Sequence, residues 1–518
     1  MCGFIYQERK NSKLRLNKFN FIKASKLINH RGPDSKNYIF NENINIFHAR
    51  LKIIDLNKRS DQPMTRLGYT IIFNGEIYNF EKLKKELKKD FKFQTNSDTE
   101  VLLFSYIKWK EKMFTKISGM FSFIIFNKTK NLLFFARDLF GQKPLYFFNN
   151  KDQIIFSSEI KPIIKLTKNK NIIFEEREIY KYLNFNYYGD SNETFFKKIF
   201  QVKPGMFGYF RNKKFIYNKI NYKSKLIKPK SIKIQNLLKN EIKEHLVSDV
   251  ETAIMISDGI DSKSILDITK KKFNKNLKLF NLDFDNFDNS LFKKTYHTKK
   301  QSNLFITKFS KNEMMKKLKN AAKICEAPPL SLFTIGMLKL FENIKKEKIK
   351  VVLNGQGIDE IFGGYNSLYS KKNKKNQYHP DGSILVNTSK IYKKKIYSKI
   401  NNQNNFVLQR KDMSFKSKIP KNLNQYDKIS MKYSIECRSP YLNNNLANLL
   451  DKLKLNQLYR NGHKKYLFRK ILFNITKDKF YFMEKNFKQA PQTEYMLDKK
   501  NIKNINKIIN KKNYCDKY

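Results

Sequence analysis

The first half of the chain alternates short apolar runs with polar breaks. The runs are rich in β-branched and aromatic residues and end at Asn, Gly or Asp, a pattern typical of short strands. Residues 79–89 and 99–110 instead show the apolar spacing of helices, and Ser97-Asp98 is a typical N-cap for the second helix. Two layers of sheet covered by helices are the natural packing of such elements. The predicted strands are 45–48, 69–73, 121–126, 132–136 and 154–156.

The second half alternates predicted strands and helices. Helical spacing covers 234–246, and short strands of the buried type are predicted at 252–256, 277–284 and 351–353. Elements that alternate in this way form parallel sheets with α/β connections. We therefore expect an N-terminal domain at 2–212, a basic connector at 213–230 and a C-terminal α/β domain at 231–518.

The charge of the chain is its most unusual bulk property. The 518 residues carry a formal net charge of +59, which suggests a polyanionic partner. The lysines, however, are spread along the whole chain among Asn, Ile, Phe and Tyr, and no RNA- or DNA-binding signature accompanies them. We attribute the charge to overall composition and expect no specific nucleic-acid partner.

Composition also indicates the cellular environment. No apolar run reaches the roughly 18 residues of a membrane-spanning helix, and no secretory signal pattern is present. The cysteines form no CxxC pair and the six histidines do not cluster with them, so neither a disulfide framework nor a structural zinc site is expected. These features favour the cytoplasm. The four cysteines are Cys2, Cys325, Cys437 and Cys515.

The first three residues contain a candidate nucleophile. Removal of Met1 would leave Cys2 with a thiol and a free α-amine on one carbon. An α-amine has a pKa near ~8, so it can accept the thiol proton during attack without a separate His. An incidental cysteine after the start codon is the alternative, and the neighbouring motifs decide between the two.

Three polar motifs of the first half fit this nucleophile. Arg50 follows a predicted strand and can clamp a carboxylate bidentately. Asn74-Gly75 presents a side-chain amide beside a flexible backbone N–H, the two donors that an oxyanion hole requires. Asp98 can receive a substrate ammonium. Each motif alone is commonly structural, but together they suit the two charged ends of an α-amino acid and an acyl group under attack.

The second half contains a candidate phosphate site. The strand at 252–256 leads into residues 257–263, which read Ser-Asp-Gly-Ile-Asp-Ser-Lys, and then into a helix. Backbone N–H groups and the helix dipole converge on phosphate oxygens at such a junction. The string is not the Walker pattern, and an ordinary N-cap would look similar.

Acidic residues follow the later strands. The strand at 351–353 ends in a Gly-rich turn that carries Asp359 and Glu360, two acids that suit a Mg²⁺ held largely through substrate phosphates. Further along, Glu436 and Arg438 add another acid and a guanidinium.

The motifs of the first half form a series that resembles the class II glutamine amidotransferase domain of glutamine-hydrolysing asparagine synthetases. In that family a terminal Cys attacks the glutamine side-chain amide and releases ammonia. The resemblance implies an αββα sandwich of the Ntn-hydrolase type, with Cys2 as nucleophile and Asn74 and Gly75 as the oxyanion hole. The implied glutamine contacts are Arg50, Leu51, Lys52, Ile53, Ile54, Asn74, Gly75, Glu76 and Asp98. The motifs are Cys2-Gly3, RGPD at 31–34, HARLKIIDL at 48–56, QPM at 62–64, FNGEIYN at 73–79, SDTEVLL at 97–103, GMFSF at 119–123, ARDLFGQKPLY at 136–146 and SSEIKP at 157–162.

The second half resembles the synthetase domain of the same family, a parallel-sheet ATPase of the adenine-nucleotide α-hydrolase type. Lys485 fits the family's late Lys, which neutralises phosphate charge during adenylation. The implied ATP contacts are Ile256, Ser257, Gly259, Asp261, Ser262, Leu282, Asn354 and Gly355. The implied acceptor and adenylation residues are Gln356, Asp359, Glu360, Glu436 and Arg438, and Asp261 and Asp359 are the candidate Mg²⁺ ligands.

The phosphate loop departs from the family pattern SGGxDSS. Asp258 replaces a Gly, which places a carboxylate beside the expected pyrophosphate and a Cβ where a positive φ would be needed. Lys263 replaces a Ser and restores one positive charge. Outside the loop, Gln356 replaces an acid, Asn443 an Asp and Met483 an Arg that many relatives have.

The sequence thus predicts an enzyme that hydrolyses glutamine at Cys2 and passes ammonia internally. With ATP and Mg²⁺ it adenylates and amidates a carboxylate, most simply the β-carboxylate of aspartate. Two alternatives stay open, namely the same chemistry on another carboxylate such as a uronic-acid sugar, and a glutaminase whose synthetase half has decayed. The family suggests a homodimer.

Overall fold

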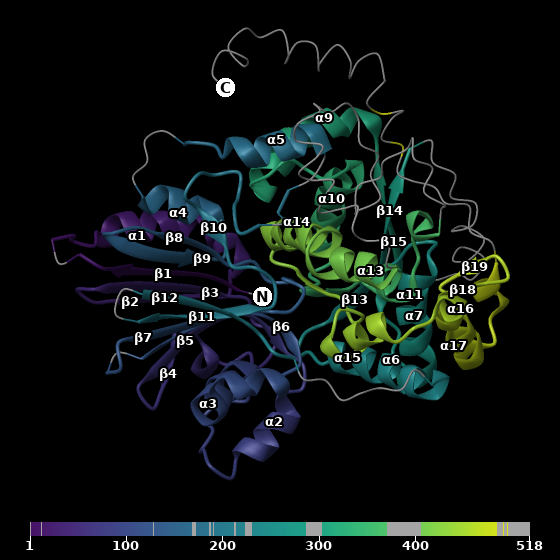
Figure 1. Ribbon diagram of the computed structural model, residues 1–518, viewed down its shortest axis with the longest axis horizontal. Helices are drawn as coiled ribbons and strands as arrows, with labels where there is room; N and C mark the ends of the chain where they lie inside the picture. Colours follow the sequence, from purple (N-terminus) through teal and green to yellow (C-terminus); the bar gives the residue numbers. More distant parts are fainter. Residues whose placement is uncertain are drawn as a thin grey trace, which may run out of the picture.

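The chain folds into two parts that lie side by side (Figure 1). The N-terminal part contains two antiparallel sheets, and the C-terminal part contains one parallel sheet. The computed structural model describes residues 2–11, 13–127, 129–167, 172–185, 188–189, 191–211, 214–222, 230–285, 303–369, 406–483, 491 and 495.

The first antiparallel sheet incorporates the N-terminus of the chain. Its central strand β1 (Gly3–Arg9) pairs on both sides, so that Gly3 lies opposite Ala49 and Ile5 lies opposite Ser157. Residue 2 is thereby held at the end of a buried strand. In spatial order the strands are β10 (Phe200–Gln201), β8 (Tyr146–Asn149), β9 (Gln153–Ser157), β1, β3 (Ile44–Arg50) and β2 (Ser35–Phe40).

The second antiparallel sheet is built around the long pair β5 and β6, in which Tyr69 lies opposite Asn127 and Ile77 lies opposite Gly119. In spatial order its strands are β12 (Lys214–Lys219), β11 (Met206–Arg211), β7 (Leu132–Arg137), β6 (Gly119–Asn127), β5 (Tyr69–Ile77) and β4 (Met64–Arg66).

Period-two alternation along these strands gives each sheet two apolar faces. Side chains such as Phe4, Ile124 and Phe135 fill the space between the sheets. The outer face of the first sheet packs on α1 (Lys18–Ser25) and α4 (Ile160–Leu166), and that of the second on α2 (Phe80–Leu87) and α3 (Asp98–Trp109). The order of layers is helix, sheet, sheet, helix (Figure 1), which confirms the predicted αββα sandwich.

The C-terminal part contains a five-stranded parallel sheet, as predicted. Ile254 of the central strand lies opposite Leu279 on one side and Leu353 on the other. In spatial order the strands are β15 (Leu304–Phe309), β14 (Lys278–Phe284), β13 (Thr252–Met255), β16 (Val351–Leu353) and β17 (Glu436–Arg438).

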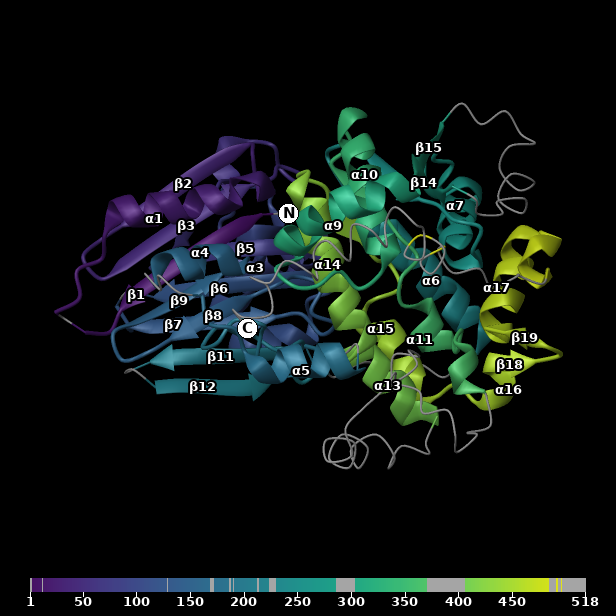
Figure 2. The same ribbon diagram turned by 90° about the horizontal axis from the view of Figure 1, so that it is seen from above.

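Helices cover both faces of the parallel sheet (Figure 2). One face packs on α6 (Ser231–His245), α7 (Ile260–Phe273) and α17 (Tyr466–Thr476). The other packs on α9 (Lys311–Cys325), α10 (Leu332–Lys346) and α14 (Lys418–Lys432). The remaining elements are α5 (Glu176–Phe185), α11 (Ile358–Phe362), α13 (Phe406–Phe415), α15 (Asn444–Ala447), α16 (Leu455–Leu458), the strand pair β18 (Tyr459–Arg460) and β19 (His463–Lys464), and short 3₁₀ segments at 26–31, 58–60, 110–115, 366–368, 448–451 and 479–482.

The predicted connector at 213–230 needs correction. Its first residues form β12, which pairs with β11 along the edge of the second sheet. Phe215 and Tyr217 are half-buried and pack against the core between the sheets, while Lys214, Ile216 and Asn218 are exposed. The strand is hard to recognise in the sequence because the lysines around it resemble those of the basic connector. The sandwich therefore extends at least to Lys219.

The helices of the described ranges do not include one that combines the length and apolar character needed to cross a bilayer.

Candidate functional site

Cys2 lies buried where β1 begins. Its backbone N–H donates to Oδ1 of Asn74 (3.1 Å), and its carbonyl accepts from Nε of Arg31 (3.0 Å). Burial raises the pKa of the Cys2 thiol, and a hydrogen bond from the backbone of Leu51 and the charge of Arg50 offset this rise only in part. A nearby base is therefore needed to take the thiol proton.

Asn74 and Gly75 lie on β5 next to the thiol. Because the side-chain oxygen of Asn74 is used by Cys2, its Nδ2 is left as a buried donor without a hydrogen-bond acceptor among the described residues. At Gly75 a Cβ would lie 2.1 Å from the carbonyl oxygen of Met120, so only glycine fits. A buried, unused amide donor beside a nucleophile is what an oxyanion hole needs.

A pocket of about 350 Å³ opens beside Cys2. Lys52 is absent from its lining and directs its backbone N–H to Asp34 (2.8 Å). The structure thus brings together seven of the nine implied glutamine contacts at the pocket wall, and Asn74 adjoins it through Cys2. The lining consists of Cys2, Arg50, Leu51, Ile53, Ile54, Gln62, Phe73, Gly75, Glu76, Ser97, Asp98 and Thr99.

Arg50 holds the loop that forms one side of this pocket. Its Nη1 donates to the carbonyl of Asn57 (2.9 Å) and to Asp61 (2.8 Å), and its Nη2 donates to the carbonyls of Ile54 (3.1 Å) and Asp55 (2.5 Å). The four Nη hydrogens are therefore already used. The predicted bidentate clamp is corrected, because only Nε remains to face a ligand.

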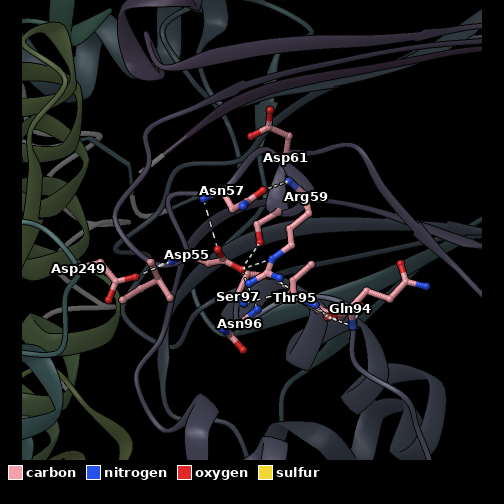
Figure 3. A network of polar contacts seen from close by, with 12 residues as sticks. Asp55, Asn57, Arg59, Asp61, Gln94, Thr95, Asn96, Ser97 and Asp249 are labelled. Atoms are coloured by element: carbon pink, nitrogen blue, oxygen red, sulfur yellow. Dashed lines mark hydrogen bonds and ion pairs between the residues drawn. The ribbon is translucent and has the colours of Figure 1, made fainter.

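Asp55 joins this loop to the residues that precede α3 (Figure 3). Its carboxylate accepts from Ser60 (2.6 Å) and from the backbone N–H of Asn96 (2.7 Å). Its own N–H donates to Asp249 of the C-terminal part (2.8 Å). Burial alone would raise the pKa of Asp55, but these hydrogen bonds lower it on balance. The pocket loop is thus fixed from both parts of the molecule.

Two buried carboxyl groups face the pocket. Asp98 begins α3 after its N-cap Ser97 and accepts the backbone N–H of Ile77 (2.9 Å). Burial raises the pKa of Asp98 to about 6. Burial and the neighbouring Asp98 raise the pKa of Glu76 well above its ordinary value, although Arg438 opposes that rise. The ammonium group of an incoming substrate would favour the ionised forms of these two carboxyl groups.

Arg438 and Glu436, which were predicted for the acceptor site, lie against the glutamine pocket. Alternation along β17 turns Cys437 toward α10 and α14 and the two charged residues toward the opposite face. Arg438 donates to Glu436 (2.6 Å) and to Glu76 (3.0 Å). No sequence motif indicates this contact, because it joins residues 362 positions apart.

The predicted phosphate loop lies where β13 ends and α7 begins. The N–H of Ser257 donates to Oγ of Ser262 (3.0 Å), and the N–H of Gly259 donates to Oγ of Ser257 (3.2 Å). Gly355, after β16, packs on the first turn of α7, since a Cβ there would lie 2.8 Å from the backbone of Asp261 and Ser262. The two strand ends therefore form one site at the carboxyl edge of the sheet, where ligands bind in open α/β folds.

The backbone of Ile256, an implied ATP contact, is partly used in hydrogen bonds to β14. The N–H of Ile256 donates to the carbonyl of Phe280 (2.8 Å), and its carbonyl accepts from Nδ2 of Asn281 (2.9 Å). Leu282 lies on β14 beyond the end of its pairing with β13.

Lys465 is a site residue that the sequence analysis missed. Its Nζ contacts Asp261 (2.7 Å) and Asp359 (2.5 Å), so it bridges the two predicted Mg²⁺ ligands. These contacts outweigh the effect of burial and raise the pKa of Lys465. Lys485, which was predicted to neutralise phosphate charge, lies outside the described residues. The available signal in the sequence was that Lys465 directly precedes the segment 466–476, whose apolar spacing predicts a helix.

The departures from the loop pattern have structural explanations. Asp258 does not have the positive φ that its replacement of Gly suggested. Lys263 does not supply charge to the loop, because its Nζ pairs with Asp267 (2.7 Å) and Asp478 (2.9 Å). Asn443 caps α15 through the N–H of Leu446 (2.9 Å), a role that Asp would perform equally well.

Near the implied acceptor site, Glu360 is buried and accepts from the hydroxyl of Tyr365 (2.5 Å). Burial and the neighbouring Asp359 raise its pKa to about 7. Gln356 is half-buried, and its N–H donates to Oδ1 of Asn354 (3.1 Å).

Comparison with known proteins matches both parts. Residues 1–222 match a family described as a glutamine amidotransferase domain, and residues 233–514 match a family described as asparagine synthase. Asparagine synthetase [glutamine-hydrolyzing] 1 of Bacillus subtilis (strain 168) is 33% identical over 388 residues, which are 71% of this chain and 59% of the relative.

Two further relatives extend the comparison. Putative asparagine synthetase [glutamine-hydrolyzing] 2 of Methanocaldococcus jannaschii is 30% identical over 66% of this chain and 72% of its own length. A Gibberella zeae protein named amidase chry2 is 26% identical over 66% of this chain and 54% of its own length. The matched region spans 59% of the length of Bacillus subtilis asparagine synthetase 1 and 63% of the length of asparagine synthetase 3 of the same organism. Because the asparagine synthase match covers more than half of the chain, the protein belongs to the asparagine synthase family and carries a glutamine amidotransferase domain at its N-terminal end.

Proposed function

We propose that this protein is a glutamine-dependent amidotransferase that uses ATP to convert a carboxylate into an amide, with aspartate as the simplest acceptor. The observation that carries the proposal is the arrangement around Cys2. A buried thiol, an unused amide donor on Asn74 and a pocket containing Asp98 lie together at the start of β1. Family membership supports the same reaction.

In the proposed first half-reaction, Cys2 attacks the side-chain amide of glutamine. The α-amine freed by removal of Met1 takes the thiol proton and returns it to the departing ammonia. Nδ2 of Asn74 and the N–H of Gly75 stabilise the oxyanion, and Asp98 binds the glutamine ammonium. Water then cleaves the thioester, releasing glutamate and the thiol.

In the proposed second half-reaction, the phosphate loop and Gly355 hold ATP. The acceptor carboxylate attacks the α-phosphorus, giving an acyl-adenylate and pyrophosphate, since a free carboxylate is a poor acyl donor. Ammonia from the first site displaces AMP and forms the amide. Lys465 supplies positive charge beside the phosphates, a role the sequence analysis gave to Lys485.

The fit of Mg²⁺ rests on two carboxylates. Asp261 and Asp359 converge on one point, which Nζ of Lys465 occupies. In the described ranges no cluster of three or more His, Cys, Asp and Glu side chains could hold a metal. Mg²⁺ would be held by these two carboxylates together with substrate phosphates, provided that Lys465 turns from the carboxylates toward the phosphates, and it would neutralise phosphate charge.

A second acceptor class is favoured by one feature of this chain. Gln356 places a neutral amide where many relatives have an acid, and the relatives found include proteins named amidases. The alternative is the same reaction on another carboxylate, such as a uronic-acid sugar. A panel of acids incubated with glutamine and ATP, with products identified by mass spectrometry, distinguishes the two.

The proposal is tested by Cys2→Ala. This variant should lose glutamine-dependent amide formation and keep ammonia-dependent amide formation, because only the first half-reaction needs the thiol. Amide formation and pyrophosphate release are measured with each nitrogen source. Full glutamine use by Cys2→Ala would overturn the nucleophile assignment, and absence of pyrophosphate release in the native protein would indicate a decayed synthetase half.

A further inference from the structure

Arg438 connects the two parts of the molecule through its side chain. The guanidinium is fully buried, and its Nη2 donates to Glu76 in the glutamine pocket (3.0 Å). Its Nη1 donates to the carbonyls of His245 (2.8 Å) and Val247 (2.6 Å), at and just beyond the end of α6. A buried arginine in this position satisfies helix-end carbonyls and holds one pocket carboxyl in a fixed direction.

The same end of β5 packs against α6 through aromatic rings. Tyr78 lies two residues beyond Glu76, and its ring centroid is 3.7 Å from that of His245. The guanidinium of Arg438 lies 5.6 Å from the Tyr78 ring. The segment of β5 that forms the pocket wall is therefore clamped between α6 and β17.

The backbone of Arg438 connects to the proposed nucleotide site. Its carbonyl accepts the N–H of Asn354 (2.9 Å), and the hydroxyl of the next residue, Ser439, donates to Oδ1 of Asn354 (2.9 Å). Gly355 in turn packs on the first turn of α7. A continuous series of contacts thus runs from the phosphate loop through Asn354 and Arg438 to Glu76.

We propose that Arg438 is a positioning residue that couples glutamine binding to occupation of the nucleotide site. A nucleotide that orders Asn354 also fixes β17, and Arg438 then holds Glu76 in the direction that glutamine requires. By linkage, glutamine tightens nucleotide binding by the same factor. The inference rests on the proposed function, and it adds that the two half-reactions are connected through this residue as well as through the ammonia they share.

The experiment measures glutamate release against glutamine concentration in the full-length protein, with and without saturating Mg²⁺ and α,β-methylene-ATP. In the native protein the analogue should lower the KM for glutamine about fivefold, the lower end of typical coupling factors. Arg438→Lys keeps the charge but loses the planar fork. It should raise the KM about tenfold, leave kcat within about threefold, and bring the ratio of the two KM values to about one.

Two further variants separate coupling from general damage to the fold. Ser439→Ala removes one hydrogen bond on the nucleotide side, so it should keep the native KM without analogue and reduce the ratio. Asn424→Ala removes a hydrogen bond to the hydroxyl of Tyr146 (2.7 Å) that also joins the two parts but involves no residue of this series of contacts. It should keep the native ratio.

The outcomes separate this inference from the function on which it rests. If the native protein hydrolyses glutamine and forms amide but has the same KM for glutamine with and without the analogue, the coupling alone is overturned. A native ratio retained by both Arg438→Lys and Ser439→Ala also overturns it. Absence of glutamine hydrolysis in the native protein overturns the proposed function and the inference together.

Discussion

At the scale of single residues, the most informative group is Asp98. Its carboxyl is buried at the start of α3, and burial raises its pKa to about 6. Since only the carboxylate binds an ammonium, kcat/KM for glutamine should fall about tenfold per pH unit below about 6, with ammonia-dependent synthesis as the reference. Asp98→Asn should lower kcat/KM at neutral pH by about 30-fold or more, the effect of losing one partner of a buried charge pair.

The same pKa shift predicts the effect of Asp98 on stability. Because the pKa of Asp98 is higher in the folded state than its unfolded value of 3.8, the protonated carboxyl favours folding. This contribution to the free energy of unfolding is fully present below pH 3.8 and is lost as the pH rises through about 6. Asp98→Asn should therefore unfold at the same or higher denaturant concentration than the native protein at pH 7.5. A less stable Asp98→Asn at that pH would contradict the shift.

Asn74 supports a second residue-scale prediction. Asn74→Ala removes the buried Nδ2 donor, and the loss of one oxyanion-hole donor lowers kcat by about 100- to 1,000-fold. Because this donor acts in the transition state, the KM for glutamine should change much less than kcat. Steady-state glutamate release provides both constants. A rise in KM with unchanged kcat would mean that Asn74 only binds substrate.

At the scale of elements, the sequence predicted the strands and helices whose own residues show a recognisable apolar pattern. The pair β5 and β6 and the central strands β13 and β16 were found from short apolar runs, and helix α3 was found from helical spacing. Strand β12 was missed because basic residues flank its alternating Phe215 and Tyr217.

The candidate site was predictable only where contiguous motifs define it. Cys2, Asn74 and Asp98 meet because β1, β5 of the facing sheet and α3 place separate motifs around one pocket. The bridge made by Lys465 and the contact between Arg438 and Glu76 depend on how distant elements pack, which residue types and spacing do not encode.

Gly355 supports a prediction about how β16 meets α7. Gly355→Ala places a Cβ 2.8 Å from the backbone of Asp261 and Ser262, so the first turn of α7 must move from the strand end. ATP-dependent amide formation should fall by about tenfold or more, since misplacement by a fraction of an ångström at a reactive centre is costly. Glutamine hydrolysis without nucleotide should stay within about twofold. Gly462→Ala is a control for backbone strain without a steric clash, because φ of Gly462 is +76° and its Cβ would meet nothing within 4 Å.

At the scale of the whole molecule, the two parts are joined by buried charges as well as by apolar packing. Glu326, at the end of α9, accepts the N–H groups of Ile160 (3.0 Å) and Lys161 (2.8 Å) at the start of α4. It also pairs with Lys428 of α14 (2.9 Å), and both side chains are 2% exposed. One carboxylate therefore binds a helix N-terminus of one part and a buried lysine of the other.

Glu326→Gln should loosen this junction. The amide keeps the shape of the side chain but leaves Lys428 buried without its counter-charge, a change that costs about 3–5 kcal/mol in comparable buried pairs. Denaturant unfolding should show this loss, or a separation of one transition into two if the parts then unfold independently. Glu86→Gln is the matched control, since its pair with Lys116 is exposed and such pairs contribute about 1 kcal/mol or less. Equal stability of the two variants would mean that apolar packing alone joins the two parts.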